Sequence, residues 1–237
     1  MAANFFYLLT VLPALPALAE PFPTEDVMAK IRDESDDNLL LLADLLECES
    51  EIEKCGLQYY VLDHKDFRPC FSDRIPESFV DTFMSFSVTR EADWFSLVYA
   101  AWFELLIAVG DKTGSALLKQ WARWEYSLRT ALRIDRLKVA GKLAAEHDAI
   151  VPGFMKELSE VPDNAHFAEA YKSFSEPMKA EKFLDQTRID YLRGLVAQFS
   201  FTIDELVAYL LELRIHNRYA RLSPEKGRKI LKEVTTL

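Results

Sequence analysis

The sequence is poor in glycine, and it lacks the short turns that join β-strands. Only seven glycines occur among 237 residues, and neither Asn-Gly nor Asp-Gly, the usual two-residue hairpin turns, is present. Alanine, leucine, glutamate and lysine are abundant instead, and these residues favour helices. The chain is therefore predicted to be all-α or nearly so, a bundle of helical hairpins.

Signatures of catalysis and of cofactor binding are also missing. The three cysteines, Cys48, Cys55 and Cys70, form no C-x-x-C pair, and no histidine stands at the spacing of a zinc ligand. Neither a G-x-x-x-x-G-K-[ST] loop nor a G-x-G-x-x-G turn for phosphates occurs. We therefore expect no enzyme activity, no metal and no cofactor.

One short motif resembles a catalytic loop. Asp111-Lys112-Thr113-Gly114 is similar to the phosphorylation loop of P-type ATPases, in which the aspartate is the nucleophile. That chemistry needs metal-binding carboxylates held by a parallel sheet, and the sequence has no alternation of strands and helices. The motif is therefore interpreted as a glycine-bounded connection between two helices.

Two apolar segments bear on the location of the protein. The run Trp94–Val109 contains Glu104 and is shorter than the roughly 20 residues that a membrane span requires, so it is predicted to be a core helix. The run Phe5–Leu12 is followed by Ala17-Leu18-Ala19, which imitates a secretory cleavage site, but the first basic residue is Lys30. A cytoplasmic protein is expected, and secretion is the alternative.

Charge is unevenly distributed along the chain. The formal net charge of −10 argues against a general nucleic-acid partner. Between Glu20 and Glu53, twelve acidic residues oppose two basic ones, and between Arg214 and Lys232 seven basic residues oppose one acidic residue. Such polarity either orients a partner or reflects solvated helix faces.

The order of elements follows from caps, prolines and apolar periodicity. A proline-punctuated, extended segment, with a possible short strand at 5–12, is predicted to precede a helix that begins at Thr24. Further helices are expected at about 38–55, from about 76, at 94–109, from 114 to near 141, at 163–174, at 177–198, from the capping box at Thr202 and from Ser223, with irregular structure at 57–75 and a tight turn at 110–114. The whole is predicted to be one helical domain, with two lobes possible at 1–110 and 111–237.

Two groups of arginines are candidate docking residues. Arg129 and Arg133 follow an apolar stripe that contains Trp121 and Trp124, and Asp135 falls close to that stripe, where a carboxylate needs a partner. An ion-pair network and a solvated face are both compatible with this pattern. The second group is Arg214, Arg218 and Arg221, which share one helical face; arginine on such a face is common at protein interfaces.

Three stretches together resemble a known family. They are Asn4-Phe-Phe-Tyr-Leu-Leu-Thr-Val-Leu-Pro13, the block Trp124–Lys138, and the segment Asp204–Leu222 leading to Glu225-Lys-Gly227. The chain is similar to the V/A-type ATPase family of C-type subunits, called d-type in eukaryotes, and closer to a bacterial family that replaces it. The resemblance implies a helical, funnel-like, non-catalytic subunit that joins the rotating central stalk to the membrane ring. Its partners would be other rotary ATPase subunits, at the inner face of the membrane and through protein contacts.

A different class of function remains as an alternative. The aromatic side chains of Trp94 and Trp102, with the carboxylate of Glu104, could line a pocket. In that case the chain is a helical ligand-binding protein or enzyme.

Overall fold

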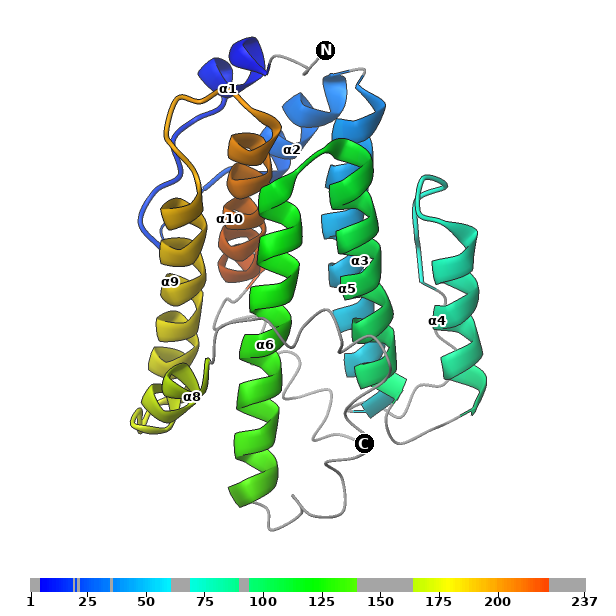
Figure 1. Cartoon of the computed structure of the whole chain (residues 1–237), viewed down its shortest axis with the longest axis vertical. Helices are drawn as coiled ribbons and strands as arrows, with labels where there is room; N and C mark the ends of the chain where they lie inside the picture. Colours follow the sequence, from blue (N-terminus) through cyan, green and yellow to red (C-terminus); the bar gives the residue numbers. More distant parts are fainter. Residues whose placement is uncertain are drawn as a thin grey trace. The chain divides into compact units, whose positions relative to one another are not determined.

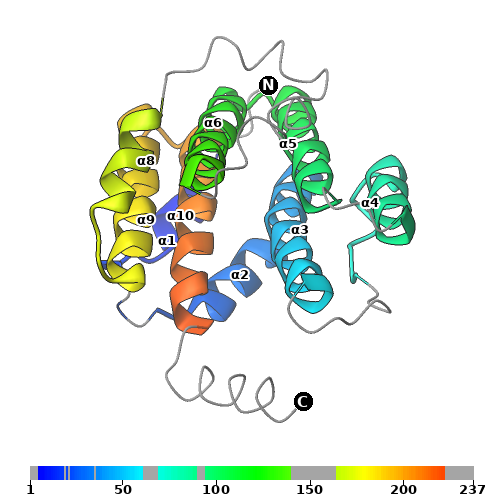
Figure 2. The same cartoon turned by 90° about the horizontal axis from the view of Figure 1, so that it is seen from below.

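The computed structural model describes residues 5–18, 20, 22–34, 36–60, 69–89, 94–139 and 164–221, and all the regular secondary structure within them is helical. No strand occurs within these ranges, so the prediction of an all-α fold is confirmed. The helices (Figures 1 and 2) are α1 (Phe6–Val11), α2 (Thr24–Asp33), α3 (Asp37–Tyr60), α4 (Glu77–Thr89), α5 (Trp94–Thr113), α6 (Ala116–Val139), α8 (Ala165–Lys172), α9 (Pro177–Leu195) and α10 (Ile203–Arg221).

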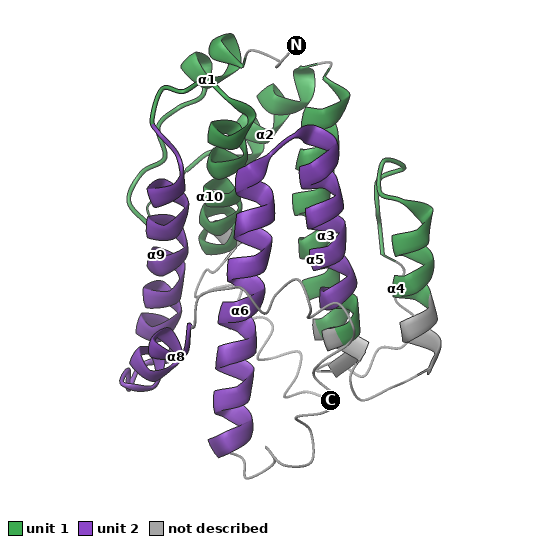
Figure 3. Cartoon of the chain, viewed as in Figure 1, with its two compact units in different colours: residues 1–98, 198–237 green, residues 99–197 purple. Residues whose placement is uncertain are grey.

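The chain divides into two compact units (Figure 3). Unit 1 consists of residues 1–98 and 198–237, and unit 2 consists of residues 99–197. The lobes considered above, 1–110 and 111–237, have a different boundary, because α10 packs on α2 and α3 near the other end of the chain. Unit 1 is therefore discontinuous in sequence.

The core of unit 1 is built where α2, α3 and α10 pack together. Val27 and Ile31, one helical turn apart on α2, are almost fully buried, and α10 contributes Leu206, Leu210 and Leu213. The carboxylate of Asp44, inside α3, accepts hydrogen bonds from Arg32 Nη2 at 2.6 Å and from Ser72 Oγ at 2.6 Å. Through its hydrogen bond with Ser72, Asp44 thus connects the segment that precedes α4 to α3.

Unit 2 is organised around α6, which packs on α8 and α9. The rings of Trp124 and Tyr191 stack, with centroids 4.2 Å apart and planes at 9°. Trp121 lies against both of them, and the side-chain amide of Asn164 donates to the carbonyl oxygen of Trp124 at 3.2 Å. The tryptophan stripe predicted for this helix is therefore core, as expected from its spacing.

Several predicted element boundaries are wrong. The possible strand at 5–12 is the short helix α1, in which Leu8 is buried; Leu12, four residues further at the C-terminal cap, is buried as well. Helix α3 does not stop at Gly56 but continues to Tyr60. Helix α5 runs to Thr113, so the turn contracts to Gly114, which has φ 75°, and to Ser115, whose Oγ accepts from the Leu118 amide at 3.1 Å.

The predicted capping box at the start of α10 is present in a modified form. Thr202 Oγ1 accepts a hydrogen bond from the Glu205 amide at 3.4 Å. The Glu205 carboxylate reaches further back and accepts from the amides of Phe199 at 2.8 Å and Phe201 at 2.6 Å. The predicted helix at Ser223 and the helix end near 141 lie outside the described residues.

Candidate functional site

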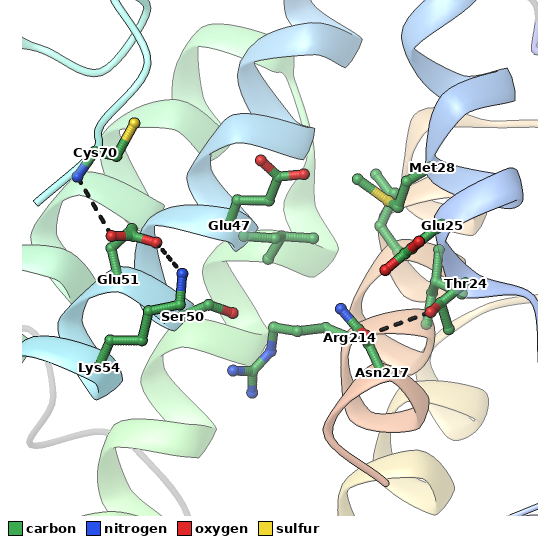
Figure 4. A pocket seen from close by; sticks show the side chains of 13 residues that line it. Thr24, Glu25, Met28, Glu47, Ser50, Glu51, Lys54, Cys70, Arg214 and Asn217 are labelled. Atoms are coloured by element: carbon green, nitrogen blue, oxygen red, sulfur yellow. Dashed lines mark hydrogen bonds and ion pairs between the residues drawn. The ribbon is translucent and has the colours of Figure 1, made fainter. Parts of the chain in front are cut away.

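A groove between α2, α3 and α10 is the candidate binding site of unit 1 (Figure 4), with a volume of about 240 Å³. Thr24 and Asn217 face each other at one side, where Thr24 Oγ1 lies 3.3 Å from Asn217 Oδ1. Arg214 extends across the groove towards α3. The volume is below the roughly 300 Å³ at which small-molecule pockets begin, so the groove has room for only a small ligand.

The charges around this groove are largely engaged with one another. Glu47 pairs with Arg32 at 2.9 Å, and Glu51 pairs with Lys54 while also accepting a hydrogen bond from the Cys70 amide at 3.3 Å. Within the described part of the chain, no group of three or more histidine, cysteine or acidic residues is placed to hold a metal ion. The groove is thus better suited to holding three helices together than to binding an ion.

Two of the three thiols are poor nucleophiles. Burial, aided by the nearby negative charges of Glu49 and Glu51, raises the pKa of Cys48 well above its usual range. Burial and the Glu51 carboxylate raise the pKa of Cys55 to about 11. Because the thiolate is the reactive form, neither residue has the activation that catalysis by cysteine requires.

Unit 2 contains a buried ion cluster that connects α6 with α9. The Glu125 carboxylate accepts from Arg188 Nε and Nη2, both at 2.9 Å, and from Arg129 Nε at 2.7 Å. Arg188 also donates to Asp185 Oδ1 at 2.9 Å. The side chains of Glu125, Asp185 and Arg188 are at least nine-tenths buried, and that of Arg129 is 28% exposed, so the cluster consists of a buried core of three charges with one guanidinium group at its edge.

Electrostatics fix the protonation state of this cluster. Burial alone would raise the pKa of Glu125, but the positive charges and hydrogen bonds of Arg188 and Arg129 outweigh it and lower the pKa to about 2. Glu125 is therefore ionised at neutral pH, and its oxygens are occupied by three guanidinium donors. A general base needs an accessible oxygen, so the cluster serves structure rather than catalysis.

The predicted docking arginines fall into two groups. Arg129 is held by Glu125, and its guanidinium also lies 4.5 Å from the Tyr99 ring centroid. Arg214 forms an ion pair with Glu49, which is completely buried. Arg133 and Arg218 are partly exposed on α6 and α10. The side chain of Arg221 lies outside the described residues.

Sequence reasoning anticipated part of the ion pairing. The Glu125–Arg129 pair, one turn apart, is present, and the carboxylate of Asp135 pairs with Lys172. Asp185 and Arg188 were missed, although a signal existed: two charged residues stand three apart among the buried residues of α9. Glu125, the second partner of Arg188, is however 63 positions away along the chain.

An apolar groove of about 430 Å³ lies beside the end of α6 in unit 2. Its walls include Leu132 and Val139 of α6 and Phe174 of the segment between α8 and α9. The guanidinium of Arg136, which lines it, is 5.9 Å from the ring centroid of Tyr171. This surface is apolar with a charged rim, the composition of a modest protein contact.

The structure also describes residues of two further sequence features, the possible pocket near Trp102 and Glu104 and the motif that begins at Asp111. Trp102 is buried in the core of unit 2 against Tyr99, whereas Glu104 is exposed, so these two side chains lie on different faces of α5. The side chain of Trp94 lies outside the described residues. Asp111 forms an exposed ion pair with Lys119 at 2.8 Å. Asp111, Lys112 and Thr113 end α5, and of the four residues interpreted as a helix connection only Gly114 lies outside the helix.

Comparison with known proteins adds one relationship. Residues 50–237, more than half of the chain, match the model of a family described as "Protein of unknown function (DUF2764)". No curated protein matches the chain, and no solved structure matches it. The matched region contains the tryptophan stripe of α6 and the whole of α10. The chain belongs to the DUF2764 family.

Proposed function

We propose that this protein is a non-catalytic central-stalk component of a V/A-type rotary ATPase, which links the rotor shaft to the membrane ring. The observation that carries the proposal is the resemblance of three sequence blocks to the family of C-type subunits. Two of these blocks, Trp124–Lys138 and Asp204–Leu222, begin within α6 and α10, the helices that supply much of the core of each unit. The resemblance therefore includes residues that form the hydrophobic cores of both units.

A protein that transmits torque must resist bending, and the ion cluster of unit 2 supports such a role. Helix α6, with 24 residues, is about 36 Å long at 1.5 Å per residue. Arg188 bridges it to α9 through two hydrogen bonds to Glu125 in a dry environment, where charge-assisted bonds are strong. Packed interiors with few voids transmit strain, which is the mechanical property that the proposed role requires.

Attachment to the membrane is proposed to occur through other proteins. No helix among the described residues is long and apolar enough to cross a bilayer. Arg133 and Arg218 are partly exposed on α6 and α10, and we propose these two, together with Arg221, for docking. Arg129 and Arg214 form ion pairs with the buried carboxylates of Glu125 and Glu49, so these two also contribute to the stability of the fold.

The proposal is tested by affinity purification of the tagged chain from native membranes in mild detergent, followed by mass spectrometry. We expect rotary ATPase shaft and ring proteins in a fixed ratio to the chain. An Arg218→Glu variant should recover less of them, whereas Lys182→Glu, on the exposed face of α9, should not differ from the wild type. Recovery of the chain alone contradicts the proposal and favours a ligand-binding function.

A further inference from the structure

Residues 5–18 lie against the start of α10 in unit 1 (Figure 1). This segment, the N-terminal strap, consists of α1 and the residues that follow it. The ring of Phe6 lies 4.6 Å from that of Phe201, in the connection before α10. Tyr209 Oη donates a hydrogen bond to the carbonyl oxygen of Pro13 at 2.9 Å. Both parts of the strap, α1 and the segment after it, are thus attached to the same region of unit 1.

The strap has little stability of its own. Helix α1 has only six residues, and an isolated helix of fewer than about 12 residues is marginal in water. Its N-cap residue, Phe5, has no polar side chain to bond the amides of the first turn. After α1, Pro13 and Pro16 carry no backbone N–H. The strap therefore keeps its conformation only while it contacts the rest of unit 1.

The contacts of the strap are separate from the main core of unit 1. That core is formed where α2, α3 and α10 pack extensively on one another, and among the described helices of unit 1, α1 takes no part in this extensive packing. The strap contributes the buried side chains of Phe5, Leu8 and Leu12. Segments with few buried apolar contacts open at a lower free energy than the core. Opening of the strap would thus leave α2, α3 and α10 packed.

The hydroxyl group of Tyr209 holds the strap in a reversible way. Burial, aided by the negative charge of Glu212, raises the pKa of Tyr209 well above its usual range, so the hydroxyl stays protonated and donates to Pro13. A hydroxyl that is shielded from water needs a hydrogen-bond partner, and here that partner lies in the strap. When the strap opens, water takes the place of each partner. The bond therefore shifts the opening equilibrium by only about fivefold.

We propose that the N-terminal strap opens and closes as a unit while α2, α3 and α10 remain packed. In the closed state it shields the hydroxyl of Tyr209 and contacts the ring of Phe201. The exposed ring of Phe199 lies 6.4 Å from that of Phe201, so opening adds further aromatic side chains to this surface. The strap thereby controls how much apolar surface unit 1 presents. This proposal is independent of the stalk function, because contacts within unit 1 carry it.

Hydrogen exchange of the full chain at pH 7, followed by mass spectrometry, tests whether the strap opens as a unit. The amides of Leu9 and Leu12 donate hydrogen bonds within the strap, and peptides from α3 report on the core. We expect strap amides to be protected, but at least about 100-fold less than those of α3. Tyr209→Phe should speed exchange of the strap about fivefold. The matched control, Tyr7→Phe, removes the same hydroxyl from a side chain that is 72% exposed and should have no effect.

Acetylation of tyrosine hydroxyls by N-acetylimidazole tests whether the strap controls access to Tyr209. Leu8→Ala removes a buried contact of the strap and should speed acetylation of Tyr209 at least about 30-fold, as expected for a lost leucine side chain. The exposed Tyr7 should react at an unchanged rate. The matched control, Val11→Ala, shortens a side chain of α1 that is 43% exposed and should change neither rate.

Each part of the proposal has an outcome that would overturn it. Equal protection of the strap and of α3, or loss of α3 protection in Leu8→Ala, would show that the strap belongs to the cooperative core. Strap exchange that Tyr209→Phe does not accelerate would show that α1 frays without opening of the strap. An unchanged rate of Tyr209 acetylation in Leu8→Ala would show that the strap does not control access to this side chain.

Discussion

The ion cluster of unit 2 gives a quantitative prediction about stability. Replacing Glu125 by glutamine removes the charge that neutralises two guanidinium groups, of which Arg188 is almost fully buried. Asp185 remains as the only carboxylate in contact with Arg188 among the pairs described above. Breaking a buried pair while leaving one charge behind costs about 3–5 kcal/mol, so Glu125→Gln should lower the free energy of unfolding by that amount.

The lowered pKa of Glu125 makes the contribution of the same ion pairs depend on pH. Its value of about 2, against an ordinary value of 4.5, corresponds to about 3 kcal/mol at 1.36 kcal/mol per pH unit. Because the folded-state pKa is depressed, this stabilisation is complete above pH 4.5 and is lost as the pH falls from 4.5 towards 2. The difference in stability between wild type and Glu125→Gln should therefore shrink over that range of pH.

Urea unfolding followed by tryptophan fluorescence provides the assay. Three of the four tryptophans, Trp102, Trp121 and Trp124, lie in unit 2, so most of the signal reports on the unit that contains the cluster. The matched control is Glu176→Gln, which breaks an exposed pair with Lys179 and should change stability by less than about 0.5 kcal/mol. The reasoning is refuted if Glu125→Gln is as stable as this control at pH 7, or if its difference from wild type does not depend on pH below 4.5.

Two further predictions concern the turn after α5 and the reactivity of the thiols. Gly114→Ala should destabilise the protein by about 1 kcal/mol because φ is 75° at this position. Gly194→Ala lies within α9, where no atom is near the added methyl group, and should stabilise the protein by about 0.5–1 kcal/mol. Thermal unfolding of the two variants measures both changes in stability. With a maleimide at pH 7, the folded protein should react at the exposed Cys70, whereas the buried Cys48 and Cys55 should not react. Mass spectrometry should find one adduct before denaturation and three after it. Rapid labelling of all three cysteines in the folded chain would contradict this prediction.

The fold class and most helices were predictable because local signals agree with the packing. The tryptophan stripe of α6 and the cap at Thr202 are readable within a few residues of sequence. The predicted strand at 5–12 was wrong because an apolar run of eight residues fits both periodicities, and only the inward packing of Leu8 and Leu12 decides between them. Gly56 did not end α3, since glycine permits a helix stop without requiring one.

The ion cluster and the Glu49–Arg214 pair could not be derived from the sequence. Arg188 and Glu125 meet across two helices, and Glu49 lies in an acidic stretch with no local mark that distinguishes it from its exposed neighbours Glu47 and Glu53. Pairing at this distance depends on tertiary packing, which periodicity does not encode. Sequence therefore predicted that charges would be present on these helices without predicting which of them are buried.

Because some of these charged side chains are paired with buried carboxylates, substitutions that test docking can also change the stability of the fold. Loss of partner binding after substitution of Arg129 or Arg214 is ambiguous, because each leaves a buried carboxylate, Glu125 or Glu49, with less compensating charge and so weakens the fold. Arg218 is partly exposed, and its guanidinium lies 5.8 Å from the ring centroid of Tyr219. A docking effect of any arginine substitution, Arg218→Glu included, is therefore attributable to the surface only if the variant unfolds at the same urea concentration as the wild type, a condition that Arg214→Glu should fail.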